Sequence, residues 1–172
     1  QSEIILLHAH FPGEDNMTES ILEAKFLGGM VGSAIGDSIG QLAFYYPDRD
    51  RLNGALERVT ELRYTDDTAM AIGLATSLVN KGHLEGRDLG ETFRINFEKE
   101  PWRGYATGPP TIFSLVRSKG ITYAEAAQML FGGSGSFGNG AAMRIVPLGL
   151  LFHNSQKIYE LACVSAEVTH AD

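Results

Sequence analysis

Two adjacent carboxylates stand in the stretch YTDDTAM, residues 64–70. Asp66 and Asp67 follow Thr65 at the predicted start of a helix, where the helix dipole favours negative charge. The dipole accounts for one carboxylate, whereas two neighbouring carboxylates repel each other unless a cation lies between them. Carboxylate and threonine oxygens suit a hard cation such as Mg²⁺. The stretch therefore indicates either an acidic helix cap or part of a metal site, and the pattern alone leaves both open.

A glycine-rich segment, 133-GSGSFGNG-140, has the spacing G-x-G-x-x-G at Gly133, Gly135 and Gly138. A dinucleotide-binding fingerprint needs a strand before it, but the preceding YAEAAQMLF is typical of a helix. A Walker loop is excluded because no Gly-Lys-Ser/Thr follows. Two interpretations stay open: a flexible turn, or a phosphate cradle of backbone amides assisted by a helix that begins near Asn139.

The segments that position these residues are predicted to be helical throughout. Apolar residues recur with helical spacing, and Thr122 with Glu125 forms a capping box. Gly82 and Gly120 are predicted to end two of the helices. No alternating strand pattern and no internal repeat occurs, so the predicted fold class is all-α. The expected helices span residues 67–79, 88–98, 111–116, 123–131, 141–152 (interrupted by Pro147) and 156–167.

A further helix is predicted after residue 20, where Ser20 and Glu23 form a second capping box. It carries glycines at every fourth position: Gly28, Gly32, Gly36 and Gly40. Each glycine costs about 1 kcal/mol relative to alanine in a helix, so close approach of another element must offset four of them. We therefore expect a buried central helix.

Composition excludes several partners. A formal charge of -7 with only 14 Lys and Arg residues argues against nucleic acid. No segment approaches the ~20 apolar residues of a membrane span, and a single cysteine, Cys163, suits a small core residue in a reducing, cytoplasmic compartment. Residues 1–17 are interpreted as an N-terminal extension, with His8 and His10 incidental, and residues 18–172 as one domain portion.

Five segments resemble, in order, the motifs of the ADP-ribosylglycohydrolase family. They are GGMVGSAIGDSIG, YTDDTAM, RGYATG, GSGSFGNGAAMR and THAD, which together extend to the end of the chain. The resemblance implies a compact orthogonal all-helical fold with two Mg²⁺ ions beside the terminal ribose of ADP-ribose. The form GSGSFGNG is similar to the branch that acts on serine-linked and polymeric ADP-ribose.

The resemblance also implies the roles of individual residues. Thr65, Asp66 and Asp67 would hold Mg²⁺, which would position ribose hydroxyls and lower the pKa of a bound water during hydrolysis of the glycosidic bond. The implied ADP-ribose contacts, with Tyr105 and Phe131 on the adenosine side, are Gly104, Tyr105, Gly108, Phe131, Gly135, Ser136, Phe137, Gly138 and His170.

Two departures from the family pattern affect this interpretation. Phe44 occupies the position of the family's glutamate and cannot transfer a proton, so Asp48 or Asp50, expected in the following loop, would have to substitute for it. The family's GGDTDT-like metal ligands are also missing, so the chain is expected to be an N-terminal portion that requires a C-terminal half. The resemblance thus predicts a Mg²⁺-dependent ADP-ribosyl glycohydrolase. The alternatives are a catalytically degenerate ADP-ribose-binding module and a purely structural relative.

Overall fold

The computed structural model describes residues 19–171, apart from the side chains of Glu19 and Ser20, and these residues form helices with no β-strand. The all-α prediction is confirmed. The predicted Ser20–Glu23 capping box, His8 and His10 lie outside the described atoms. The helices are α1 (Glu19–Tyr45), α2 (Arg49–Leu56), α3 (Asp66–Lys81), α4 (Gly86–Lys99), α5 (Gly108–Lys119), α6 (Tyr123–Gln128), the 3-10 helix η1 (Leu130–Gly133), α7 (Gly140–Met143), α8 (Val146–Phe152) and α9 (Ile158–Glu167).

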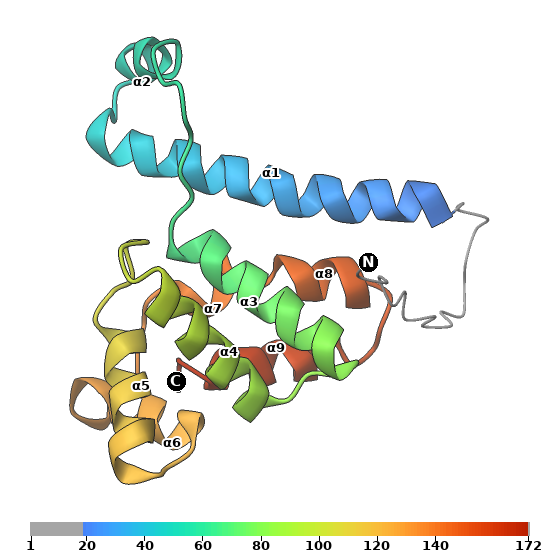
Figure 1. Cartoon of the computed structure of the whole chain (residues 1–172), viewed down its shortest axis with the longest axis vertical. Coiled ribbons are helices and arrows are strands. Elements are labelled where there is room, and N and C mark those ends of the chain that lie inside the picture. The colour runs from blue at the N-terminus through green and yellow to red at the C-terminus, as the bar shows by residue number, and fades with distance from the viewer. Residues whose placement is uncertain (1–18, 172) are drawn as a thin grey trace.

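The helices form a packed body beneath a long first helix. Figure 1 shows α1 crossing above α3 and α8, with α2 at the far end of α1 and the remaining helices below. Leucines and an isoleucine from four helices are fully buried at the centre of the body: Leu74 of α3, Leu89 of α4, Ile112 of α5 and Leu148 of α8. Within residues 19–171, no helix is both long and apolar enough to span a membrane.

The helix boundaries follow the local signals in the sequence. Gly82 and Gly120 end α3 and α5 in the left-handed conformation, as predicted. The predicted capping box is formed, because the Thr122 hydroxyl accepts from the Glu125 amide while the Glu125 carboxylate accepts from the Thr122 amide. These caps fix where α3, α5 and α6 stop or start.

Three parts of the predicted helix pattern are corrected. The predicted helix 123–131 ends as α6 at Gln128, because Phe131 and Gly132 adopt positive φ values that an α-helix does not allow. Residues 49–56 form α2 rather than a loop, because the Asp48 carboxylate accepts hydrogen bonds from the amides of Asp50 and Arg51 and so caps this short polar helix. The predicted helix 141–152 is divided into α7 and α8. Pro147 lies in the first turn of α8, where its missing N–H is tolerated.

The expected burial of the glycine ridge, Gly28, Gly32, Gly36 and Gly40, is wrong for the described chain. A Cβ built on any of the four would meet no other atom within 4 Å. Another glycine, Gly29, makes the close helix contact, because a Cβ there would lie 2.8 Å from Leu150 of α8. Leu27, Val31 and Ile35 are also exposed. The α1 face with the glycine ridge therefore has no packing partner among residues 19–171.

The glycine contacts predict opposite effects of one substitution at two sites. Gly90→Ala should lower the free energy of unfolding by about 1–3 kcal/mol, because its Cβ would lie 2.4 Å from the buried Tyr123 ring. Gly32→Ala should raise it by up to about 1 kcal/mol, because the site is open and alanine favours a helix. Chemical denaturation of both variants of this chain measures the difference, and effects of equal sign would contradict the described packing.

Candidate active site

The Asp37 carboxylate on α1 holds the start of α3. One oxygen accepts from the Thr65 hydroxyl at 2.6 Å, and the other accepts from the Thr65 amide at 2.8 Å and the Thr68 hydroxyl at 2.7 Å. The Thr68 amide also donates to it, at 3.2 Å. Because Asp66 and Asp67 lie between these two threonines, Asp37 fixes the backbone that presents both carboxylates.

Arg103, between α4 and α5, also holds this segment. Its guanidinium lies 3.7 Å from the centre of the Tyr64 ring and donates to the Tyr64 carbonyl and to Glu100. The Arg103 carbonyl accepts a 2.7 Å hydrogen bond from the Asp66 amide. Backbone and side chain of Arg103 therefore both contribute to the position of Asp66.

Asp66 and Asp67 border a pocket of about 640 Å³, which we call the acidic pocket. One wall is α1, where Gly36 and Gly40 leave space because they have no side chains. The chain after α4 contributes Gly104, whose Cβ position is 3.8 Å from an Asp66 oxygen. The full lining is Ser33, Gly36, Asp37, Gly40, Gln41, Phe44, Tyr45, Thr65, Asp66, Asp67, Gly104, Asn139 and Met143.

The acidic pocket holds uncompensated negative charge. Burial raises the pKa of Asp66 to about 6, with a further contribution from repulsion by Asp67. The pKa of Asp67 is also raised, first by burial and then by repulsion from Asp37. Among the ion pairs of the described residues, none involves Asp66 or Asp67. A bound cation would relieve both penalties.

The donor set suits a cation but is incomplete. The Thr65 hydroxyl donates to Asp37 and accepts from the Asp67 amide at 3.3 Å, and a second lone pair is left on its oxygen. Within residues 19–171 no cluster of three or more His, Cys, Asp or Glu side chains could by itself enclose a metal ion. Thr65, Asp66 and Asp67 therefore fit one side of an oxygen-lined metal site.

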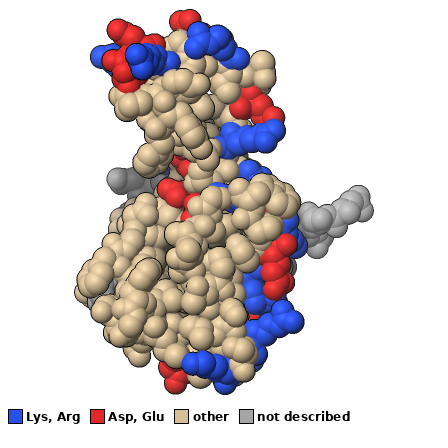
Figure 2. Space-filling view, turned by 90° about the vertical axis from the view of Figure 1, so that its left-hand side faces the viewer, with Lys and Arg blue, Asp and Glu red and all other residues tan. Residues whose placement is uncertain are grey.

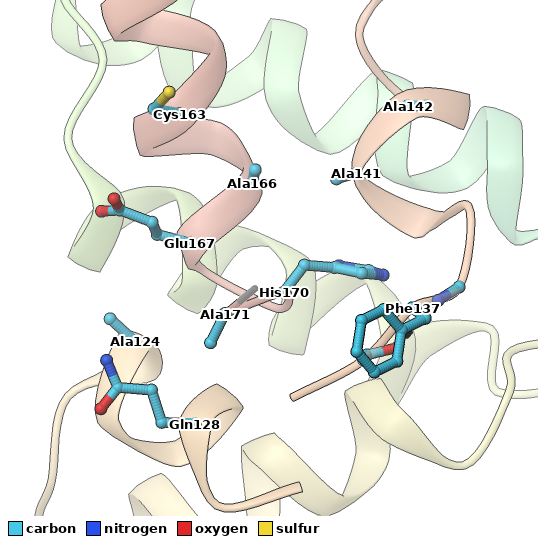
Figure 3. Close-up of a pocket in the computed structure, with 12 residues that line it drawn as sticks. Ala124, Gln128, Phe137, Ala141, Ala142, Cys163, Ala166, Glu167, His170 and Ala171 are labelled. Carbon is cyan, nitrogen blue, oxygen red and sulfur yellow. Dashed lines mark hydrogen bonds between the residues drawn. The ribbon is translucent and has the colours of Figure 1, made fainter. Parts of the chain in front are cut away.

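A second pocket, of about 530 Å³, lies on the other side of the glycine-rich segment, and we call it the His170 pocket. Figure 3 shows the His170 ring directed toward Phe137, with α9 on one side and Ala141 and Ala142 on the other. Ser136, Phe137 and Gly138 line this pocket, while the next residue, Asn139, lines the acidic pocket. The glycine-rich segment thus connects the two pockets.

The backbone of this segment is shaped by residues with positive φ. Gly135 has φ 72° and is buried, and its amide donates to the Leu130 carbonyl, so it contributes a left-handed turn. Phe131 has φ 51°, a strained value for a residue with a side chain, and its ring is 64% exposed. Phe137 is 80% exposed. Both rings therefore stand outside the core.

Other residues assigned by the resemblance lie elsewhere. Tyr105 packs edge-on against Phe97, with ring centres 5.1 Å apart, and Gly108 is buried at the start of α5, so neither lines either pocket. Asp48 and Asp50 also lie outside the acidic pocket. They belong to the α2 end of the molecule, where Figure 2 shows clustered charged side chains at the top. Cys163, expected in the core, is half-buried beside the His170 pocket.

The fold and the site together define an all-helical protein in which a glycine-rich segment joins an acidic pocket to a second pocket. The sequence pattern of the family described as ADP-ribosylglycohydrolase matches residues 18–172. The chain belongs to this family.

Individual relatives agree with this family membership. Human ADP-ribosylhydrolase ARH3 is 35% identical over 165 residues, which cover 86% of this chain and 45% of the relative. The zebrafish (Danio rerio) protein of the same name is 36% identical over 158 residues, covering 86% and 43%. ADP-ribosyl-[dinitrogen reductase] glycohydrolase of Rhodospirillum rubrum is 31% identical over 144 residues, covering 78% and 47%. The chain thus spans less than half the length of these relatives.

Several residues that organise the site received no role from the sequence. In the sequence, Asp37 stood only as one letter of the motif GGMVGSAIGDSIG, and Arg103 and Arg144 only as the first and last letters of two other motifs. Each acts through contacts between segments distant in the sequence, such as Asp37 with Thr68 and Arg144 with Thr169. The signal that could have identified them is a charged residue inside an otherwise small or apolar motif.

Replacing Asp37 should weaken the fold at the site. We expect Asp37→Ala to lower the free energy of unfolding by about 1–3 kcal/mol, because it removes the acceptor of two amides and two hydroxyls. The matched control is Asp48→Ala, which removes an exposed cap from the peripheral α2 and should have a smaller effect. Equal losses in chemical denaturation would contradict the role of Asp37.

The raised pKa of Asp66 predicts a pH-dependent effect in metal-free solution. The folded chain binds this proton more tightly than the unfolded chain, so ionisation of Asp66 destabilises the fold. This penalty is absent below the ordinary pKa of 3.8 and is complete above about 6. Asp66→Asn should therefore raise the melting temperature above pH 6 and leave it nearly unchanged at about pH 3.5. The opposite pattern in thermal melts, or no difference at either pH, would contradict the assignment.

Proposed function

We propose that the protein containing this chain hydrolyses the ribose glycosidic bond of ADP-ribosylated protein or ADP-ribose polymer. This proposal rests on one observation: the consecutive residues 136–139 border both pockets, with 136–138 lining the His170 pocket and 139 lining the acidic pocket. An elongated ligand lying across the glycine-rich segment would have one end beside the carboxylates of Asp66 and Asp67 and the other beside His170. The names of the relatives, which describe ADP-ribosylhydrolases, support the same substrate class.

The two pockets suit different parts of ADP-ribose. The acidic pocket presents carboxylate and hydroxyl oxygens that would bind a divalent cation and the hydroxyls of a terminal ribose. Exposed Phe137 would offer a ring face for stacking by the adenosine end, and Ser136 and Gly138, which line the His170 pocket after the turn at Gly135, would place the backbone beside a diphosphate. Binding energy from the adenosine end can then orient the bond that reacts at the other end.

Thr65, Asp66 and Asp67 are proposed to hold Mg²⁺ at this site. When bound, Mg²⁺ would supply positive charge beside the ribose, which favours a glycosidic bond cleavage that passes through an oxocarbenium-like state. Asp37 and Arg103 position the segment that carries these ligands, and the α1 wall without side chains leaves room for the sugar.

A second part of the family's domain is proposed to complete the site. The α1 face with the glycine ridge exposes Leu27, Val31 and Ile35, and the chain covers 45% of human ARH3. We propose that the remaining part of the domain packs on this face and supplies further metal ligands. In that complete protein Gly32→Ala should then destabilise the fold, whereas in this chain alone it should stabilise it.

The alternative function is an ADP-ribose-binding module without hydrolytic activity. Phe44, 89% exposed, borders the acidic pocket at the position where the family usually has a glutamate. A phenyl ring cannot accept or donate the proton that an acid would transfer. In this alternative the pockets bind ADP-ribose and the bond is not cleaved.

The test uses the complete protein with Mg²⁺ and a serine-ADP-ribosylated peptide or ADP-ribose polymer, and measures the release of free ADP-ribose. Asp66→Ala and Asp67→Ala should each lower turnover at least ~100-fold through loss of a metal ligand. The control Glu61→Gln, at an exposed residue outside the acidic pocket, should leave turnover unchanged.

Calorimetry with ADP-ribose separates the two functions. Tight binding without turnover favours the binding module, and a gain of turnover in Phe44→Glu would identify Phe44 as the reason. Asp48→Asn and Asp50→Asn test whether either carboxylate substitutes for the absent glutamate. Absence of both binding and turnover in the wild-type protein would contradict both functions.

A further inference from the structure

A short helix, α7, borders both pockets. Ala141 and Ala142 line the His170 pocket, whereas Asn139, just before the helix, and Met143, at its end, line the acidic pocket. Figure 3 shows Ala141 across the His170 pocket from Ala166 of α9. The position of α7 against α9 therefore affects both the width of the His170 pocket and the way in which the two pockets lie relative to each other.

Helix α7 has little internal means of holding this position. It comprises only the residues Gly140–Met143, has no side-chain hydrogen bond at its N-terminal end, and none of its residues is buried. A single helical turn is unstable in water without support from packing. The place of α7 must therefore be fixed by contacts that its flanking residues make with other elements.

Arg144, directly after α7, makes such contacts with the end of α9. Its guanidinium donates to the Thr169 hydroxyl at 2.7 Å, to the Ser165 hydroxyl at 3.4 Å and to the Ser165 carbonyl. This carbonyl is one of the last four of α9, which have no amide partner within the helix. Arg144 thus caps α9 from another element, at the helix end where the dipole favours positive charge.

The Arg144 side chain is also held by α4. It is fully buried, and its guanidinium lies 4.8 Å from the centre of the Phe93 ring. Phe93 packs in turn on α3, because a Cβ built on Gly73 would lie 2.8 Å from its ring. Among the ion pairs of residues 19–171, none includes Arg144, and Arg144 lines neither of the two pockets. A buried charge that loses its partners is costly, so this side chain has one strongly preferred place and can affect a ligand only through the elements that it holds.

We infer that Arg144 is a positioning residue that anchors α7 to the end of α9 and so keeps the acidic pocket and the His170 pocket in a fixed relation. The consequence for a ligand rests on the proposed function, because a ligand that spans both pockets, as ADP-ribose would, depends on that relation. Misplacement of a bound group by about 1 Å can lower a reaction rate by about 100-fold. Asp66 and Asp67 are held separately, by Asp37 and Arg103, so their own position does not depend on Arg144.

Cys163 provides a probe of this anchoring that needs no ligand. Its thiol is half-buried on the α9 side of the His170 pocket. Arg144→Lys keeps the positive charge but loses the planar fork that reaches Ser165 and Thr169 together. In the complete protein, the rate at which a thiol reagent modifies Cys163, measured by mass spectrometry, should rise ~5-fold in this variant because the pocket opens more often. The matched control, Ile112→Val in the buried part of α5, should leave this rate unchanged.

Calorimetry of the same variants measures the consequence for binding. At a temperature where the variant is folded, ADP-ribose affinity should fall ~10-fold in Arg144→Lys and stay near the wild-type value in Ile112→Val. Mg²⁺ affinity should change less than ~2-fold in both variants, because the segment that carries Asp66 and Asp67 keeps its own hydrogen bonds. A protein that is merely destabilised would instead show equal effects of the two substitutions.

An unchanged Cys163 rate in Arg144→Lys overturns the positioning role, as does an equal increase in Ile112→Val or, where the wild type binds ADP-ribose, an unchanged affinity in Arg144→Lys. If Cys163 responds as expected but the wild-type protein binds no ADP-ribose, the positioning role stands and the proposed function fails. Should Arg144→Lys not fold, Thr169→Val removes one acceptor of the guanidinium, and Thr169→Ser, which keeps the hydroxyl, is its control. Faster modification of Cys163 in Thr169→Val but not in Thr169→Ser then supports the positioning role, and equal rates overturn it.

Discussion

The carboxylate of Asp37 links α1, the longest described helix, to the start of α3, where the candidate metal ligands lie. It accepts four hydrogen bonds from Thr65 and Thr68, and so it caps α3 from another helix. A local cap such as Thr122 with Glu125 only starts its own helix, but the Asp37 cap also sets where α1 lies above α3. Because α1 and α3 both line the acidic pocket, its shape depends in part on this side chain.

The sequence predicted the features that depend on contacts between residues close together along the chain. It missed the features that depend on contacts between residues far apart along the chain. Gly82, Gly120 and the Thr122–Glu125 pair act within one turn of chain, so their effects follow from the order of residues. Helix α2 was missed because its polar residues have no apolar period, and the cap at Asp48 is its main signal. The glycine ridge was correctly predicted to be helical, but the pattern could not tell whether a partner covers it.

The residues of the candidate site also divide into those that the local sequence identified and those that only the fold revealed. The pair Asp66–Asp67 and the glycine-rich segment were identified by residue type and spacing, and the structure places them on one connected surface. Tyr105 illustrates the limit, because a motif position does not reveal that an aromatic ring packs against Phe97 instead of bordering a pocket. The roles of Arg103 and Arg144 depend on carbonyl and hydroxyl acceptors brought together only by folding.

The bare face of α1 has a consequence for motion. Four glycines leave the helix backbone open to water, and exposed helical hydrogen bonds open more readily than those covered by side chains. Amide protons of α1 will therefore exchange with solvent faster than those of α3 and α4, whose residues form the core. The α1 wall of the acidic pocket is thus expected to open more readily than the core helices, and a ligand bound in this pocket should slow amide exchange in α1.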